Sequence, residues 1–189
     1  MVPPLDPSTE THEIESVSLP LTSRLLGRGD EPWLIQVLVR LHVIETHMSL
    51  YSARSILQID HLQMSVKLHG SEVDALFLAI EGLTKEDSRE VIVTCEAKSV
   101  DEDISDDQVL RQIRAVFDSP IITQEIVIPI VVKAVRPSLV RVIEFEAIRR
   151  KDAASTELLA VASDALYEFV PRVPGIGEKK KRKPRKSSR

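Results

Sequence analysis

Two acids and one lysine stand in neighbouring strand-like segments and could act together. The segment EVIVTCEAKS (90–99) alternates between apolar and polar positions, so Glu96 and Lys98 share one face of the strand. Asp74 stands near the start of the preceding segment, SEVDALFLAIEG (71–82). The pair of Glu96 and Lys98 is either an ordinary ion pair at a strand end or the acid and base of a metal site.

The two segments are joined by a short polar connection, which predicts an antiparallel hairpin. We pair Ile80 with Ile92. Asp74 then lies opposite Lys98, and Glu96 lies on the same face as both. A shift of the register by two residues keeps the three side chains together, whereas a shift by one separates them.

Two carboxylates and one lysine are the groups that metal-assisted cleavage of a phosphodiester needs. Carboxylate oxygens on Asp74 and Glu96 suit Mg²⁺, with Mn²⁺ as a possible substitute, and the carbonyl of Ala97 could add a ligand. Such a metal polarises the phosphate and lowers the pKa of a bound water. Lys98 could orient or activate that water, or neutralise the charge that grows on the phosphate.

The motif, its spacing and the order of the elements resemble the PD-(D/E)XK nuclease superfamily. Asp74 matches the first acid of the motif, Glu96 the second, and Lys98 the lysine, while Val73 stands where a proline is usually written. The resemblance covers about residues 30–148. It implies an α/β protein of the restriction-endonuclease-like fold, with an αβββαβ core and a mixed central sheet flanked by helices. It also implies a Mg²⁺-dependent DNA endonuclease of the restriction or repair type.

Some members of the superfamily add an acid from the first helix and a glutamine from the helix after the lysine. Glu45 is the corresponding acid here and a predicted metal ligand; the alternative is a glutamate on the helix surface. Gln108 and Gln112 are four residues apart, on one face of the later helix. Gln112 is the predicted catalytic residue of this pair, and Gln108 can also serve in a helix cap.

The surrounding pattern predicts the element order α-β-β-β-α-β-β-α. The first helix begins at the N-cap Asp30 and runs to residue 50, and a later one begins at the N-cap Ser105 and ends near Asp118. The remaining predicted elements are strands over 57–70, 71–82, 90–99, 121–135 and 139–148, and a final helix over 156–170. Pro129 favours a sheet edge or a bulge for its strand.

The composition is that of an ordinary globular domain, but acidic and basic residues are unevenly distributed along the chain. We expect a flexible leader over 1–22, a nuclease-like domain over 23–172 and a basic disordered tail over 173–189. Residues 179–189 hold eight basic side chains and no acid, which leaves seventeen basic against twenty-nine acidic residues in the rest, a balance of −12. A tail of this kind can contact a polyanion, act as a nuclear-localisation segment, or simply be solvated.

The single cysteine excludes an internal disulfide and fits a reducing compartment. With no secretory signal or bilayer-spanning segment in the sequence, we expect a cytoplasmic, nucleoid-associated protein, or a nuclear one in a eukaryote. DNA is the expected partner, and the resemblance implies a homodimer or a subunit of a larger nuclease system. The alternative is a catalytically inactive module of the same fold that binds nucleic acid or a protein partner.

Overall fold

The computed structural model describes residues 4–25, 29–68, 70–84 and 86–178. Within these ranges the strands are β1 (Thr11–Glu15), β2 (Ile56–Leu68), β3 (Ser71–Gly82), β4 (Ser88–Lys98), β5 (Ile126–Arg136), β6 (Leu139–Phe145), β7 (Ile148–Arg149) and β8 (Val161–Val170). The helices are α1 (Leu21–Leu25), α2 (Glu31–Arg40), α3 (Val43–Leu50), α4 (Asp106–Asp118) and the short 3-10 helix η1 (Arg150–Asp152). In this part of the chain no helix is long and apolar enough to cross a membrane.

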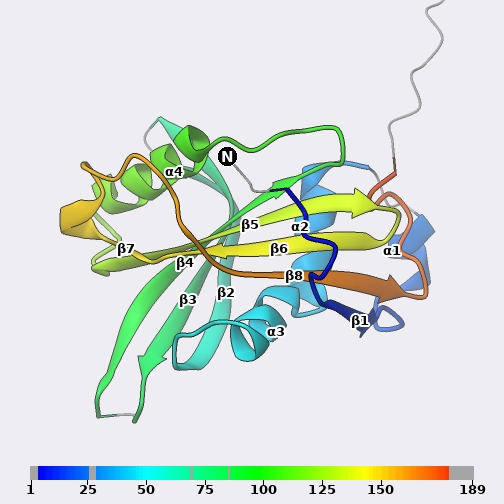
Figure 1. Cartoon of the computed structure of the whole chain (residues 1–189), viewed down its shortest axis with the longest axis horizontal. Coiled ribbons are helices and arrows are strands. Elements are labelled where there is room, and N and C mark those ends of the chain that lie inside the picture. Colours follow the sequence, from blue (N-terminus) through cyan, green and yellow to red (C-terminus); the bar gives the residue numbers. More distant parts are fainter. Residues whose placement is uncertain (1–3, 26–28, 69, 85, 179–189) are drawn as a thin grey trace, which may run out of the picture.

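The protein is an α/β protein with one mixed, open sheet (Figure 1). The strands follow the spatial order β1-β8-β6-β5-β4-β3-β2, and β7 pairs with β5. One buried cluster joins α2 and α3 to one face of the sheet, and a second joins α4 to the other face. The expected mixed sheet between helices is therefore present, and it continues beyond β5, on the side away from β4, with β6, β7, β8 and β1.

The first predicted helix is divided in two. Asp30 is the N-cap, and its side chain accepts a hydrogen bond from the backbone N–H of Trp33 at 3.1 Å, as predicted. The helix ends at Arg40, and His42 adopts a left-handed conformation with φ of 52° before α3 begins. A continuous helix over 30–50 was wrong because a left-handed residue cannot lie inside an α-helix.

The β3–β4 hairpin is present, with its register shifted by two residues from the predicted one. Ile92 pairs with Leu78 instead of Ile80, and the ladder continues to the pair of Gly82 and Ser88. The turn is therefore shorter than the polar connection suggested, because Ser88 and the residue after it already belong to β4. A shift of two keeps every side chain on its predicted face.

The predicted helix α4 is present. Ser105 caps α4, as predicted, and accepts a hydrogen bond from the backbone N–H of Gln108 at 3.3 Å.

The predicted strand β5 lies in the centre of the sheet. β5 runs parallel to β4 and antiparallel to β6. Pro129 lies inside β5, between its pairing with β7, which ends at Val127, and its pairing with β6, which begins at Ile130. The sheet thus leaves a gap where proline has no N–H to donate.

The last predicted helix is a strand. β8 pairs antiparallel with β6 and parallel with β1. Ala165, Tyr167 and Phe169 belong to the buried cluster with α2 and α3 and Leu166 does not, so the side chains that face this cluster recur with the period of a strand. The composition of 156–170 favours a helix, but pairing on both edges and burial of alternate side chains override that propensity.

Two segments outside the predicted nuclease-like domain take part in the fold. Thr11–Glu15, inside the predicted flexible leader, form β1 at the edge of the sheet. Val173 and Ile176, inside the predicted basic disordered tail, are buried in the core. The prediction for 179–189 lies outside the described residues.

A buried polar network links α3 to β6 and β8. His47 is fully buried, and its ring nitrogens lie 3.0 Å from the hydroxyl of Tyr167 and 2.9 Å from that of Ser163. Ser163 in turn donates to Glu144 at 2.7 Å. Burial lowers the pKa of His47 to about 4, despite the opposing charge of Asp164, so the imidazole is neutral near pH 7. This histidine stabilises the fold and lies outside the site described next.

Candidate active site

The β3–β4 hairpin brings Asp74 and Glu96 to the same end of the sheet. Ala75 pairs with Cys95, so the same register carried one residue further sets Asp74 beside Glu96. Oδ2 of Asp74 accepts a hydrogen bond from the backbone N–H of Ala97 at 2.8 Å. The two acids therefore belong to adjacent strands whose ladder fixes their separation.

Lys98 joins Glu96 to the first turn of α2. Its Nζ lies 2.7 Å from Oε1 of Glu96 and 2.6 Å from Oε1 of Glu31. The lysine side chain is only 12% exposed, and that of Glu96 only 3%. Glu31 follows the N-cap Asp30 directly, so the start of α2 determines where this third carboxylate lies.

Two glutamines from α4 hold Glu96 from the other side. Nε2 of Gln108 donates to Oε1 of Glu96, and Nε2 of Gln112 donates to Oε2. Gln112 also donates to the carbonyl of Glu72 at 2.8 Å and is only 2% exposed. The four-residue spacing turns both amides toward one carboxylate. The Gln108 side chain thus binds Glu96, and only the backbone N–H of Gln108 takes part in the cap of α4.

The charges of this group are strongly coupled. Burial, with the nearby charge of Glu96 adding to it, raises the pKa of Asp74 from 3.8 to about 7. Burial alone would lower the pKa of Lys98, but its ion pairs with Glu31 and Glu96 outweigh that effect and raise it above its ordinary value. Lys98 is therefore a permanent cation here, and it is better suited to neutralising charge than to accepting a proton.

These side chains line a cavity of about 350 Å³. Four acids contribute to its wall, namely Glu31, Glu72, Asp74 and Glu96, together with Lys98, Gln108 and apolar atoms from α2 and β2. An excess of carboxylates in a partly enclosed space attracts cations. The cavity is therefore a place where a divalent ion would find oxygen ligands.

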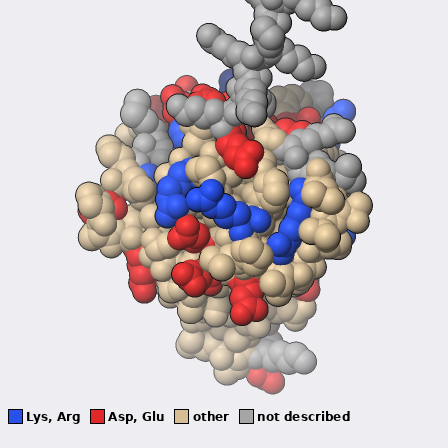
Figure 2. All heavy atoms as spheres, turned by 90° about the vertical axis from the view of Figure 1, so that its right-hand side faces the viewer, with Lys and Arg blue, Asp and Glu red and all other residues tan. Residues whose placement is uncertain are grey.

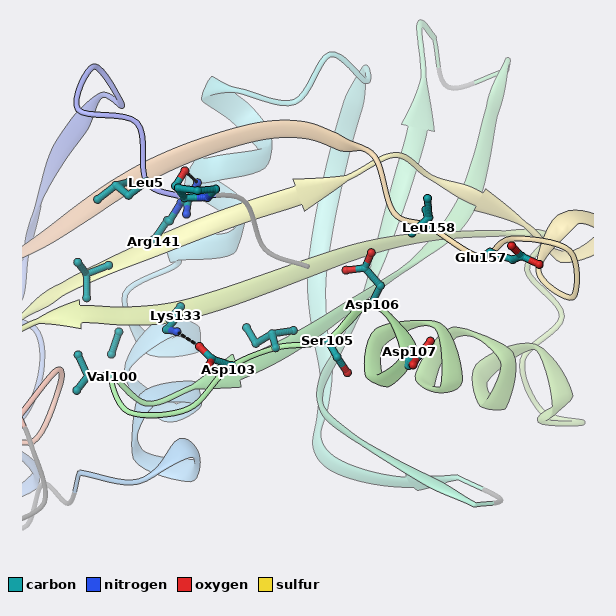
Figure 3. Close-up of a pocket in the computed structure, with 14 residues that line it drawn as sticks. Leu5, Val100, Asp103, Ser105, Asp106, Asp107, Lys133, Arg141, Glu157 and Leu158 are labelled. Carbon is teal, nitrogen blue, oxygen red and sulfur yellow. Dashed lines mark hydrogen bonds and ion pairs between the residues drawn. The ribbon is translucent and has the colours of Figure 1, made fainter.

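A larger cavity, of about 740 Å³, lies one strand further along the sheet (Figure 3). Lys133, which pairs with Lys98 across β4 and β5, reaches into it and forms an ion pair with Asp103 at 3.0 Å. Leu5 and Leu158 contribute apolar wall. Four acids line this cavity as well, namely Asp103, Asp106, Asp107 and Glu157. We assign the candidate chemistry to the smaller cavity because Asp74, Glu96 and Lys98 of the predicted motif line it together.

The sequence predictions for individual residues fall into two groups. Asp74, Glu96, Lys98 and Gln112 come together as expected. Glu45 does not join them, since its Oε1 lies 3.1 Å from Nδ1 of His42 and it does not line the cavity. It sits on α3, whereas the acid from the helical region that reaches the lysine is Glu31.

Glu31 and Glu72 were missed by the sequence analysis. Glu31 stands directly after the N-cap Asp30, a position that also suits an acid for purely helical reasons. Glu72 shares with Asp74 the alternating face of β3, which could have identified it.

The donor set fits Mg²⁺ by its chemistry. Mg²⁺ is commonly held by one or two carboxylates and keeps several waters, and Asp74 and Glu96 supply two. No described residue donates a hydrogen bond to Oδ1 of Asp74, so this oxygen can face a cation. Across the described ranges, no three His, Cys, Asp or Glu side chains are already arranged to hold a metal. Within the site, the ammonium of Lys98 lies between Glu31 and Glu96.

Comparison of the whole chain with protein-family models and with curated proteins found no match to either, so the case for a function depends on the geometry of this site.

Proposed function

We propose that this protein is a Mg²⁺-dependent DNA endonuclease of the restriction-endonuclease-like fold that hydrolyses phosphodiester bonds. The observation that carries the proposal is the convergence of Asp74, Glu96 and Lys98 in one cavity at the end of two paired strands. The order of the elements supports it. Helices α2 and α3, strands β2, β3 and β4, helix α4 and strand β5 follow one another as an αβββαβ core would.

Each residue has a part in this proposal. Asp74 and Glu96, with the carbonyl of Ala97, would hold the ion, which when bound polarises the phosphate and lowers the pKa of a water. Gln108 and Gln112 orient the Glu96 carboxylate and restrict its rotation. Lys98 keeps its positive charge and lies where negative charge would grow on the phosphate.

Cleavage of supercoiled plasmid tests the proposal. We expect nicking with Mg²⁺ or Mn²⁺ and none with EDTA. Asp74→Ala or Lys98→Ala should lower the rate by about 10²–10³-fold or more, because each removes a charge that acts on the reacting phosphate. Glu45→Gln is the matched control and should cleave like the wild type, since Glu45 lies outside the cavity. Equal nicking by all four proteins would reveal a contaminating nuclease and refute the proposal.

The second candidate is a module of the same fold that binds nucleic acid or a protein partner without catalysis. It is favoured by the way Lys98, Gln108 and Gln112 occupy both oxygens of Glu96. Isothermal titration with Mg²⁺ separates the two candidates. Heat of binding that disappears in Asp74→Ala favours the nuclease, and an absence of binding by the wild type favours the module.

We also propose that the nuclease acts as a homodimer or as a subunit of a larger nuclease system. One chain offers one cavity of this kind among its described residues, and a double-strand break in a single encounter needs two such sites. Sedimentation equilibrium with and without duplex DNA tests the dimer. A monomer under both conditions would leave only single-strand nicking to an isolated chain.

A further inference from the structure

The Glu96 carboxylate is already occupied on the side that faces the smaller cavity. Its Oε1 accepts a hydrogen bond from Nε2 of Gln108 and lies 2.7 Å from Nζ of Lys98, and a carboxylate oxygen has two lone pairs. Gln108 and Lys98 both line the cavity. Oε2 instead accepts from the buried Gln112, which is also bonded to the carbonyl of Glu72. An ion that enters the cavity therefore has to take the place of one of the two donors on Oε1.

Lys98 is the donor that can leave, because a second acid already holds it. Its Nζ lies 2.6 Å from Oε1 of Glu31. A cation bound to Glu96 would repel the ammonium, whereas the amide of Gln108 carries no charge to repel. Among the described residues, Lys98 is the one side chain that bonds to Glu31. Glu31 is therefore able to keep the ammonium when Glu96 gives it up.

Burial separates this ion pair from those at the surface. Figure 2 shows a short band of Lys and Arg bordered above and below by Asp and Glu. A pair such as Arg136 with Glu168, whose side chains are 52% and 32% exposed, is screened by solvent and contributes little to stability. Lys98 and Glu96 are almost fully buried, so a charge left here without a partner is costly. The ammonium therefore needs an acid both before and after an ion binds.

The start of α2 places Glu31 beside the ammonium. Its neighbour Asp30 caps the helix by accepting from the N–H of Trp33, and Nε1 of Trp33 donates to the carbonyl of Pro174 at 2.8 Å. Trp33 is buried, so the first turn of the helix is tied to the core. The partial positive charge at a helix N-terminus also favours a carboxylate at this position. The backbone of Glu31 is thus held by the fold and needs no ion to position it.

We propose that Glu31 receives the ammonium of Lys98 when Mg²⁺ binds to Glu96, so that Glu31 is a positioning residue and Lys98 competes with the ion. This inference rests on the proposed function, which supplies the ion. It adds that the lysine that serves the reaction lowers the affinity of the site for the metal, and that Glu31 reduces this effect by stabilising the displaced ammonium. Removal of Lys98 should therefore tighten the binding of Mg²⁺ although it slows cleavage.

Isothermal titration with Mg²⁺ tests the competition without DNA. Lys98→Met keeps a side chain of similar length and removes the charge. We expect it to bind Mg²⁺ about tenfold more tightly than the wild type, or more, because the ion no longer displaces an ammonium. Lys133→Met is the matched control, since Lys133 pairs with Lys98 across β4 and β5 but is held by Asp103 (Figure 3). It should change the affinity by less than about twofold, because its charge is further away and screened.

A double-mutant cycle tests the part of Glu31. Glu31→Gln alone should weaken the binding of Mg²⁺ by about tenfold, because the displaced ammonium loses its acid. In the Lys98→Met background the same change should weaken binding by less than about threefold, since no ammonium has to be received. If Glu31 were itself a ligand of the ion, the loss would be equal in both backgrounds. Urea unfolding, followed by the fluorescence of Trp33, establishes that each variant is folded before the titration.

The displacement can also be observed in the wild-type protein. The Nζ resonance of Lys98 is followed by NMR in ¹⁵N-labelled protein and assigned by comparison with Lys98→Arg, which keeps the charge. We expect this resonance to shift during the Mg²⁺ titration, with the same midpoint as the heat of binding. In Asp74→Ala, which removes a ligand of the ion, it should stay in place over the same range of Mg²⁺ concentration.

Three results would overturn the inference. Lys98→Met could bind Mg²⁺ no more tightly than Lys133→Met. Glu31→Gln could weaken binding equally with and without Lys98. The Nζ resonance of Lys98 could stay in place while the ion binds to the wild type. Failure of the proposed function alone would appear separately, as Mg²⁺ binding with the expected cycle but no cleavage of the plasmid. A lack of binding by the wild type and Lys98→Met alike would refute both.

Discussion

Replacing Asp74 with asparagine isolates the cost of ionising this carboxyl. The amide has nearly the same shape, and its oxygen can still accept the hydrogen bond from the backbone N–H of Ala97. What is lost is the negative charge beside Glu96. We therefore expect Asp74→Asn to stabilise the metal-free protein at pH 8 and to have little effect near pH 4.

The sign follows from the direction of the pKa shift. Because the pKa of Asp74 is raised in the folded state, to about 7 from 3.8, the folded protein holds this proton over a range in which the unfolded chain has lost it. The contribution of protonated Asp74 to the free energy of unfolding is therefore fully present below pH 3.8 and is lost as the pH rises through 7. A shift of this size corresponds to about 4 kcal/mol, and partial contact of the carboxyl with solvent reduces the expected effect to about 2 kcal/mol.

Urea unfolding in EDTA, followed by the fluorescence of Trp33, measures the difference in the free energy of unfolding between wild type and Asp74→Asn from pH 4 to pH 8. Trp33 is the only tryptophan and is buried, so its emission reports unfolding. A gain of about 2 kcal/mol at pH 8 would raise the melting temperature by about 4–8 °C. Asp60→Asn, an exposed aspartate on β2, is the control and should show no pH-dependent gain. A constant difference between wild type and Asp74→Asn across this range would refute the reasoning.

Three further results are expected. His47 should cost about 3 kcal/mol of stability as the pH falls from 6.5 to 4, because burial lowers its pKa to about 4; this contribution is opposite in sign to that of Asp74, so it is measured as the change in the difference between wild type and His47→Gln in urea unfolding over this range. Gln112→Leu leaves Oε2 of Glu96 without its donor and should cost about 1–3 kcal/mol in the same assay, while Gln124→Leu, on the surface, should cost little. Cys95 is buried with a raised pKa, so a thiol reagent at pH 8 should modify it only after unfolding; rapid labelling of the native protein would contradict its position.

The hairpin that carries the acids could be predicted because its information is local. The alternation of apolar and polar residues along β3 and β4 determines the face of the sheet on which each side chain lies. Even a two-residue error in register leaves Asp74, Glu96 and Lys98 together. The N-caps Asp30 and Ser105 are local signals of the same kind. These features depend on residues close together in the chain.

The missed features depend on contacts between distant parts of the chain. Residues 161–170 form a strand because β6 and β1 pair with them, and β1 is more than 140 residues away in sequence. Glu31 reaches Lys98 only because α2 is packed with its first turn against the end of β4. Glu45 fits a helical pattern equally well, but the left-handed residue His42 begins a separate helix and leaves it outside the cavity.

The ammonium of Lys98, held between Glu31 and Glu96, has a consequence for when this protein can be assembled. Domains built around zinc stay unfolded until their ion arrives, because their folding free energy is largely the free energy of binding the metal. Here a covalently attached cation already offsets the repulsion between Glu31 and Glu96, which allows the chain to reach its native state in a medium free of divalent ions. A chelator would therefore leave a folded protein behind.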